Sequence, residues 1–440
     1  MGFRIAGIAA ATPGVNAYGR SVGPDEFIDF LEETYSNGSG CTLGMLERLA
    51  AKRLARIQAR STGIERRDLL VTDKVELKSI YLAALSLSRA LNEYKIKPQQ
   101  LDGIIYCSKT PDLIHPSEGL VVANLLGIDL RGKQYATVAL DCASIEKAIS
   151  HAVDWIQDGR CEKVAIVTGD INSRLSLPLN DRTAYLFGDQ FVTVILESFD
   201  EGGILTTGVS ADTTMAGALI NRSSYSGDPV SVEHAQIQGL ANDRGLGTLG
   251  IWESQIWPWL AHNLVRQGVV VDKDTVIIGP QATKKVYEEG LDGSRKNYGL
   301  DIEHNALPPA SYRHGNTGAA AYPLALCEGW QRSIKPTTKI IMIFAGVGGM
   351  FGTLVFDPKA KEIRRPLSIE IDARFPNAKE LVEKREQDPE VALSKLLEGL
   401  YCRINPPPEL GDYRALSIHN QLEKIHSLLQ AHGDDYLVAI

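Results

Sequence analysis

The chain has 440 residues, of which 44% are hydrophobic, and a formal net charge of −8. This hydrophobic share is ample for one large core or two fused ones, and the mild negative charge gives no general affinity for nucleic acid. The six cysteines show no CxxC or CxxH spacing, which argues against a disulfide framework and against a structural metal (zinc) site. No apolar stretch is long enough to span a membrane, and the first residues resemble a strand and not a signal peptide. The sequence therefore predicts a soluble, cytoplasmic protein.

Strand-like and helical runs alternate along the first part of the chain, which is typical of an α/β protein with buried sheets. Residues 3–9 predict a first strand, and residues 76–93 predict a helix whose leucines face a core. Buried strands are predicted over 103–107, 163–168 and 191–197.

The second part of the chain repeats this plan. Thr275–Gly279 is similar to the strand at 103–107, and Lys339–Phe344 is similar to the strand at 163–168. Such an internal repeat indicates a duplicated unit.

Two segments add to the duplicated plan. A basic helix is predicted over 43–60, after a glycine-rich loop. The last eighty or so residues predict an extension with two amphipathic helices, one starting at Asp388-Pro389, where aspartate can cap a helix and proline can begin it. We expect an N-terminal half over 1–200, a C-terminal half over 201–357 and a partly helical extension over 358–440. An apolar helix face most often packs on its own domain; docking of a partner is the alternative.

Cys142 stands where a strand-like run turns into a helical pattern that continues to Ile156 and stops at Asp158-Gly159. A cysteine on the first turn of a helix lies among unpaired backbone N–H groups at the positive end of the helix dipole, which favours its thiolate. The alternative is a small buried residue, since free cysteine is among the most buried residue types.

Several short motifs follow one another along the chain before and after Cys142. They are Thr62-Gly63-Ile64-Glu65-Arg66-Arg67, Leu101–Tyr106 with Thr110-Pro111-Asp112, the Cys142 helix, Lys163–Asp170, Leu186-Phe187-Gly188-Asp189, Gly315–Ala320 and Gly346–Gly352. In this order they resemble the thiolase superfamily, and within it the β-ketoacyl-(acyl-carrier-protein) synthase III branch. The resemblance implies a duplicated thiolase-like five-layer αβαβα fold, to which the C-terminal helical extension is an addition.

The resemblance also implies roles for site residues. Acyl transfer needs a nucleophile that carries the acyl group and N–H donors that stabilise the oxyanion. Cys142 matches the family's nucleophile, and its own N–H with that of Gly348 would form the oxyanion hole. Asn316 matches the asparagine that polarises the second thioester. The alternative for Asn316 is a turn residue beside Gly315.

The family's active-site histidine is absent. Pro280 stands at its position, while Gln281 and Ala282 keep the register. Proline offers neither a side-chain donor nor a base, so decarboxylative condensation loses its usual donor. His314 is the candidate replacement, because residues two apart in an extended segment face the same side, and His314 precedes Asn316 by two. A surface or loop histidine is the alternative.

His115 and Asp141 are two further residues that could influence the site. His115 lies in a region that in the family approaches the partner subunit's active site, which makes it a weaker candidate. Asp141 would raise the thiol pKa if its carboxylate pointed at Cys142, but the alternation of side chains predicts that it turns away.

The substrate entrance departs from the family as well. Ile57 stands where coenzyme-A-using relatives often have a tryptophan, so a carrier-protein-bound donor is as plausible as acyl-coenzyme A. Arg60, Gln281 and Phe191 are the substrate-binding candidates. Phe191 replaces a small residue and would either reshape the acyl tunnel or repack the core.

The sequence therefore predicts a synthase-III-like acyltransferase that forms a thioester on Cys142 and passes the acyl group to a carbon, oxygen or nitrogen acceptor. Fatty-acid-like or specialised-metabolite biosynthesis is the expected context. The substrate would be acyl-coenzyme A or acyl carrier protein, without a cofactor. The expected assembly is a homodimer, or a heterodimer with a related subunit, with Cys107 near the interface. The alternative is a non-catalytic or weakly catalytic subunit that pairs with an active ketosynthase.

Overall fold

The computed structural model of the chain describes residues 2–30, 45–70, 77–113, 115–174, 185–215, 232–332, 334–360 and 364–377, together with residues 380, 427 and 430. Two five-stranded sheets dominate these residues. The strands of the first sheet lie in the order β1 (Gly2–Ala11), β7 (Asp189–Phe199), β6 (Lys163–Ile171), β4 (Gly103–Cys107) and β5 (Gln134–Val138). Those of the second lie in the order β12 (Arg364–Pro366), β8 (Gly203–Ala211), β11 (Met350–Asp357), β10 (Lys339–Gly346) and β9 (Thr275–Ile278).

The two sheets share one pairing pattern. β1 and β7 are antiparallel, β7 and β6 are antiparallel, and β6 and β4 are parallel. β8, β11, β10 and β9 pair in the same succession of antiparallel, antiparallel and parallel. The repeat predicted from sequence is confirmed strand by strand, because β9 takes the place of β4 and β10 takes the place of β6.

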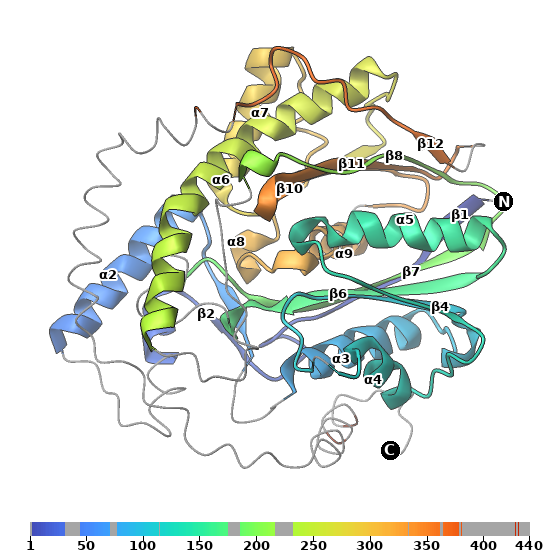
Figure 1. Ribbon diagram of the computed structural model, residues 1–440, viewed down its shortest axis with the longest axis horizontal. Coiled ribbons are helices and arrows are strands. Elements are labelled where there is room, and N and C mark those ends of the chain that lie inside the picture. The colour runs from blue at the N-terminus through green and yellow to red at the C-terminus, as the bar shows by residue number, and fades with distance from the viewer. Residues whose placement is uncertain are drawn as a thin grey trace.

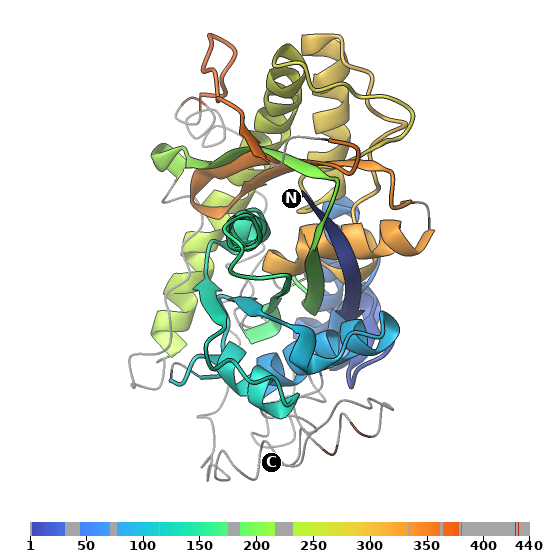
Figure 2. The ribbon, with the colours of Figure 1, turned by 90° about the vertical axis from the view of Figure 1, so that its right-hand side faces the viewer.

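Helices complete a stack of five layers, in which the two sheets alternate with three helical layers (Figure 1). The middle layer contains α5 (Ser144–Gln157) and α9 (Ala321–Arg332), and Figure 2 views α5 along its axis between the sheets. The outer face of the first sheet is covered by α3 (Lys78–Glu93) and α4 (Glu118–Leu125). The outer face of the second is covered by α6 (Val232–Arg266) and α7 (Lys284–Tyr298). The predicted αβαβα fold is confirmed.

The strands are apolar on both faces because both faces of each sheet are covered. Along β7, Val192 and Leu196 belong to the core around the middle layer, whereas Phe191 and Ile195 belong to the core beneath α3. This alternation follows the period of two of a strand. It gives the protein one core between the sheets and one on each outer side.

Smaller elements flank the layers. The predicted basic helix is present as α2 (Met45–Thr62), and a short hairpin pairs β2 (Arg20–Val22) with β3 (Arg67–Leu69). A single helical turn, α8 (Ser311–His314), precedes the Gly-Asn-Thr motif. None of the described helices combines the length and the apolar character needed to cross a bilayer.

The predicted extension begins as part of the second sheet. β12 pairs in parallel with β8, and Leu367, which follows it, is buried in the core beneath α6. The two amphipathic helices predicted further along the extension lie outside the described residues, save for isolated positions.

Candidate active site

Cys142 lies at the start of the central helix. The chain leaves β5, makes a 3-10 turn over Asp141–Ala143 and enters α5 at Ser144. Ser144 fixes this turn, because its Oγ accepts a hydrogen bond of 2.9 Å from the Leu140 N–H. The cysteine side chain is half-buried and packs against the core between the sheets. The structure therefore places Cys142 at a helix N-terminus, as the sequence predicts.

The glycine-rich loop between β10 and β11 lies against Cys142. A Cβ placed on Gly346 would lie 3.1 Å from the Cβ and 3.6 Å from the Sγ of Cys142, so a side chain there would crowd the cysteine. Gly348 has a φ of 77°, a left-handed conformation that suits glycine. Within the described residues, the N–H groups of Cys142 and Gly348 donate to no protein acceptor. They remain available for the oxyanion role predicted for them.

The side-chain oxygen of Asn316 orders a turn, and its side-chain N–H groups are left without an acceptor among the described residues. Its Oδ1 accepts a hydrogen bond of 3.0 Å from the Gly318 N–H, and its backbone N–H donates to the Leu186 carbonyl. The side chain is 7% exposed, and its Nδ2 donates to no acceptor in the described part of the chain. The 3-10 turn that follows, at Gly318–Ala320, packs against the turn that carries Cys142. Asn316 thus keeps one amide donor for a ligand while its oxygen orders the turn.

A charged cluster that the sequence did not reveal lies beside Cys142. Lys109 Nζ is 2.8 Å from Asp141 Oδ1. Asp170 lies behind it and accepts hydrogen bonds from the N–H groups of Lys109 (2.9 Å) and Ala319 (2.8 Å). Burial lowers the pKa of Lys109, but the carboxylates of Asp141 and Asp170 outweigh burial and raise it, so Lys109 stays cationic. The only sequence signal was a lysine just after a buried strand.

Asp141 does not follow the alternation expected for it. It adopts a φ of 46°, in the left-handed region, so its side chain is not placed by the period of a strand. Its carboxylate binds Lys109 and also contributes to raising the pKa of Cys142. The expectation that Asp141 turns away from the site is wrong, because the strand ends before it.

The thiol of Cys142 is held in its neutral form. Burial raises its pKa to about 12; the Lys109 charge opposes this rise, and the charges of Asp141 and Glu253 add to it. The helix start therefore does not by itself give the thiolate predicted from sequence. Acylation at neutral pH needs a group that removes the thiol proton.

His314 is engaged elsewhere. Its Nδ1 lies 2.5 Å from Asp68 Oδ2, and its Nε2 lies 2.9 Å from Glu328 Oε1. Burial lowers the pKa of His314, but the two carboxylates outweigh it and raise the pKa to about 9. The premise of an extended segment is also wrong, because His314 ends the helical turn α8 and Gly315 has a φ of 76°. With both ring nitrogens paired, His314 has no free nitrogen to serve as the missing base.

Residues 279–283, where the resemblance would place a histidine, have structural roles. Pro280 is buried two residues after the end of β9. Gln281 Oε1 accepts a hydrogen bond from the Ala310 N–H, and its Nε2 donates to the Gly279 carbonyl, both at 2.9 Å. Thr283 caps α7 through a 3.2 Å bond from the Val286 N–H. The side chain of Gln281 therefore holds two loops together, and its predicted contact with substrate has no support in this geometry.

The remaining sequence candidates lie apart from Cys142. Phe191 is fully buried beneath α3 and packs on Tyr106 with ring centroids 6.1 Å apart, on the opposite face of the first sheet from the middle layer. Arg60 is exposed in the last turn of α2, and His115 is exposed in the loop before α4. The core-packing alternative fits Phe191, and the proposed ligand contacts of Arg60 and His115 stay predictions.

Glu253 is the residue that sequence reasoning missed. It lies on α6, is 3% exposed, and makes no hydrogen bond or ion pair within the described residues. Burial raises its pKa to about 8. Its charge acts on Cys142 and on Tyr322, whose hydroxyl is bonded to the Ala345 backbone at the base of the glycine loop. A signal was present, because Glu253 is three and four residues before the buried Ile256 and Trp257 and so lies on the apolar face.

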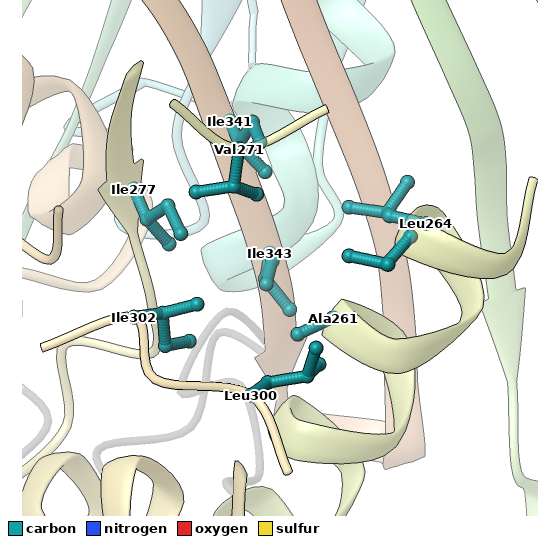
Figure 3. A pocket seen from close by; sticks show the side chains of 9 residues that line it. Ala261, Leu264, Val271, Ile277, Leu300, Ile302, Ile341 and Ile343 are labelled. Carbon is teal, nitrogen blue, oxygen red and sulfur yellow. The ribbon is translucent and has the colours of Figure 1, made fainter. Parts of the chain in front are cut away.

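A small apolar pocket lies on the far side of the second sheet from Cys142. Its walls come from α6, β9, β10 and the loop after α7 (Figure 3). Its volume of about 10 Å³ would hold at most one water molecule. This pocket is too small for an acyl chain and is no part of the site around Cys142.

Comparison with known proteins agrees with this geometry. Residues 137–213, which include Cys142, match the model of the family described as 3-oxoacyl-[acyl-carrier-protein (ACP)] synthase III. The synthase III structure from Aquifex aeolicus is 19% identical with a TM-score of 0.60, over 81% of this chain and 100% of that one. The synthase from Burkholderia xenovorans is 20% identical with a TM-score of 0.61, over 83% and 97%. The priming β-ketosynthase of the R1128 polyketide pathway is 20% identical with a TM-score of 0.57, over 81% and 97%.

The fold is thiolase-like, with a cysteine at the start of its central helix. Within that class, the match over 137–213 and the shared architecture make it a protein that resembles 3-oxoacyl-[acyl-carrier-protein] synthase III.

Proposed function

We propose that this protein is an acyltransferase that accepts an acyl group from a thioester on Cys142 and passes it to a second substrate. One observation carries the proposal: the glycine loop packs directly on Cys142, with a would-be Gly346 Cβ 3.6 Å from Sγ. The N–H groups of Cys142 and Gly348, which donate to no protein acceptor among the described residues, are the donors that we assign to the acyl oxygen. Asn316 supplies a further donor.

The donor substrate would be acyl-coenzyme A or an acyl carrier protein, and the reaction needs no cofactor. The synthase III relatives are named for the acyl carrier protein. For this chain the exposed Ile57 provides no flat aromatic ring for an adenine, which keeps the carrier protein equally supported as donor.

The acceptor would be an oxygen or nitrogen nucleophile in preference to a decarboxylated malonyl carbon. Decarboxylation leaves an enolate that relatives stabilise with a histidine and an asparagine, and here Pro280 replaces that histidine. His314 is paired to two carboxylates and does not compensate. One donor of the pair, Asn316, remains.

A second candidate is a subunit that pairs with an active ketosynthase and does no chemistry itself. The neutral Cys142 thiol, with its pKa raised to about 12, favours this reading. The N–H groups of Cys142 and Gly348 that lack a protein acceptor favour the enzyme, because a scaffold has no need of unpaired donors.

We also propose a dimer, of two identical chains or with a related subunit. Among the described strands, β5 pairs only with β4 and leaves its other edge without a strand partner. An open edge of this kind invites pairing with a second chain. Cys107 ends β4 opposite Val138 of β5, so it lies one strand away from that edge.

The test is acylation of the intact protein by a panel of acyl-coenzyme A and acyl-carrier-protein donors, followed by mass spectrometry. The expected result is one adduct that disappears in Cys142→Ala and persists in Cys161→Ala, a matched substitution of a buried cysteine. The absence of an adduct with every donor would favour the non-catalytic subunit.

A further inference from the structure

Asp170 joins the two segments of chain that lead to Cys142 and to Asn316. It lies near the end of β6, and its side chain is fully buried. Its Oδ1 accepts the hydrogen bond of 2.9 Å from the Lys109 N–H. Its Oδ2 accepts the hydrogen bond of 2.8 Å from the Ala319 N–H. A single carboxylate thus connects the loop after β4 to the 3-10 turn that follows Asn316.

The bond to Lys109 leads to the turn that carries Cys142. Asp170 holds the backbone of Lys109, and the side chain of Lys109 reaches forward, with its Nζ 2.8 Å from Asp141 Oδ1. Asp141 directly precedes Cys142 and begins the 3-10 turn that leads into α5. A displacement of the Asp170 carboxylate would therefore pass through one side chain to the residue before Cys142.

The bond to Ala319 leads to the turn that orders Asn316. This turn begins at Gly318, whose N–H donates to Asn316 Oδ1 at 3.0 Å. β6 holds the next residue twice, because Asp170 accepts from the Ala319 N–H and Thr168 Oγ1 donates to the Ala319 carbonyl at 3.1 Å. The turn lies close against the carboxylate, since a Cβ added to Gly318 would overlap Asp170 Oδ2.

We propose that Asp170 is a positioning residue for acyl transfer, which holds the Asn316 amide in place relative to the Cys142 thiol. The proposal rests on the acyltransferase function and deepens it. Asp170 is buried behind both turns and acts through them, without touching substrate. A carboxylate suits this task, because it offers two oxygens to two N–H donors and forms stronger hydrogen bonds than a neutral acceptor does. Misplacing reacting groups by about 1 Å can cost about 10²-fold in rate.

The two half-reactions use these groups differently. Forming a thioester on Cys142 requires the thiol and the N–H donors assigned to the acyl oxygen. Stabilising the enolate that decarboxylation of a malonyl thioester leaves requires the Asn316 amide as well. Replacing Asp170 should therefore slow the step that needs both groups in place and spare the step that needs Cys142 without Asn316.

The experiment compares wild type with Asp170→Asn, Asn316→Ala and the double variant. Asparagine keeps the size of the side chain but has one acceptor oxygen in place of two. Three rates are measured: acylation of Cys142 by the donor that gives the adduct, alkylation of Cys142 by iodoacetamide, and release of labelled carbon dioxide from malonyl-coenzyme A. Hydrogen exchange is followed in the peptides that contain Lys109 and Ala319.

Asp102→Asn is the matched control. Asp102 Oδ2 also accepts two backbone N–H bonds, from Glu162 at 2.9 Å and from Lys163 at 3.0 Å. It joins the opposite ends of the same two strands, β4 and β6. Along β6 the positions of Lys163 and Asp170 are about 20 Å apart, so the control removes a similar carboxylate far from both turns.

We expect Asp170→Asn to lower the release of carbon dioxide by about tenfold or more and to leave acylation nearly unchanged. Alkylation should stay equal or become faster, because removing a nearby negative charge favours the thiolate. In the Asn316→Ala background, Asp170→Asn should have almost no further effect, because residues that act as a unit are not additive. Exchange should become faster in both peptides, and Asp102→Asn should leave the three rates and both peptides unchanged.

Release of carbon dioxide by Asp170→Asn at the wild-type rate would overturn the proposal, and so would effects that multiply in the double variant. An equal loss in Asp102→Asn would also overturn it, because it would mark a general structural role of the strands. If no donor acylates the wild type, the acyltransferase function fails separately. If the wild type releases no carbon dioxide, hydrogen exchange decides alone: unchanged exchange of both peptides in Asp170→Asn rejects the connection itself.

Discussion

Replacing Glu253 with glutamine should change how the stability of the protein depends on pH. Burial raises the pKa of this carboxyl group from 4.5 to about 8. Between these values the unfolded chain has lost the proton and the folded protein keeps it. The free energy of unfolding therefore falls as pH rises through this window, by about 1.4 kcal/mol for each pH unit. The glutamine variant keeps the shape of the side chain and lacks this slope.

The magnitude follows from the shift. At pH 5 the ionisation of Glu253 in the unfolded chain costs the wild type about 1 kcal/mol relative to the variant. At pH 8 the cost reaches about 4 kcal/mol, since the shift spans about three and a half pH units. Glu253→Gln should thus be more stable than wild type, by a margin that widens from pH 5 to pH 8 and then levels off.

Urea denaturation at four pH values between 5 and 8 measures this difference. The other titrating groups cancel when the two proteins are compared at one pH, except for those that act on Glu253. Glu289→Gln is the matched control: its carboxylate is exposed, so its difference from wild type should not vary with pH. A constant difference for Glu253→Gln would refute the reasoning, because it would mean that Glu253 is ionised or solvated in the folded protein.

Four further outcomes are expected. Lys109→Met should slow iodoacetamide alkylation of Cys142 at pH 8 by about tenfold or more, because it removes the positive charge that opposes the rise of the thiol pKa. His314→Gln should lower the free energy of unfolding by about 3 kcal/mol below pH 6.5, and this deficit should vanish as pH rises through 9. The reason is that the raised pKa of His314 stabilises the fold only while the imidazole is protonated. A deficit that persists at pH 10 would count against this. Release of labelled carbon dioxide from malonyl thioesters should be slow and should fall by a further ~10²-fold in Asn316→Ala; brisk release that Asn316→Ala leaves untouched would show that the donor lies elsewhere. Light scattering should give twice the chain mass of 48.0 kDa. Substitutions that add charge along Gln134–Val138 should yield monomers. A monomeric wild type without a co-purified relative would contradict the dimer.

The sequence predicted the layers well because they depend on local pattern. The strand at 103–107 has the bounds that its apolar residues indicate, and the paired strands of the second half lie where the repeat placed them. Helices at 76–93 and 43–60 were displaced by only about two residues, which is the usual uncertainty of helix ends.

The site was predicted only in part, because its remaining groups are placed by backbone angles and distant contacts. The positive φ of Asp141 and of Gly315 redirects the chain at both ends of the site, and no alternation rule anticipates it. His314 finds its two carboxylates 246 and 14 residues away in sequence. Glu253 is buried on a helix of the other half. These pairings exist only once the sheets are stacked.

The position of α5 has a consequence for how the chain folds while it is being translated. The helix that follows Cys142 belongs to the first half but is buried on one side by strands of the second, as the bond of 2.6 Å from Thr206 on β8 to Glu146 on α5 illustrates. The loop that covers Cys142 is translated about two hundred residues after it, which takes on the order of 10–40 s at ribosomal speed. During that interval the nascent first half carries an uncovered apolar helix face and an accessible thiol. Slow elongation or an oxidising environment during synthesis should therefore damage this protein more than the same conditions applied after release.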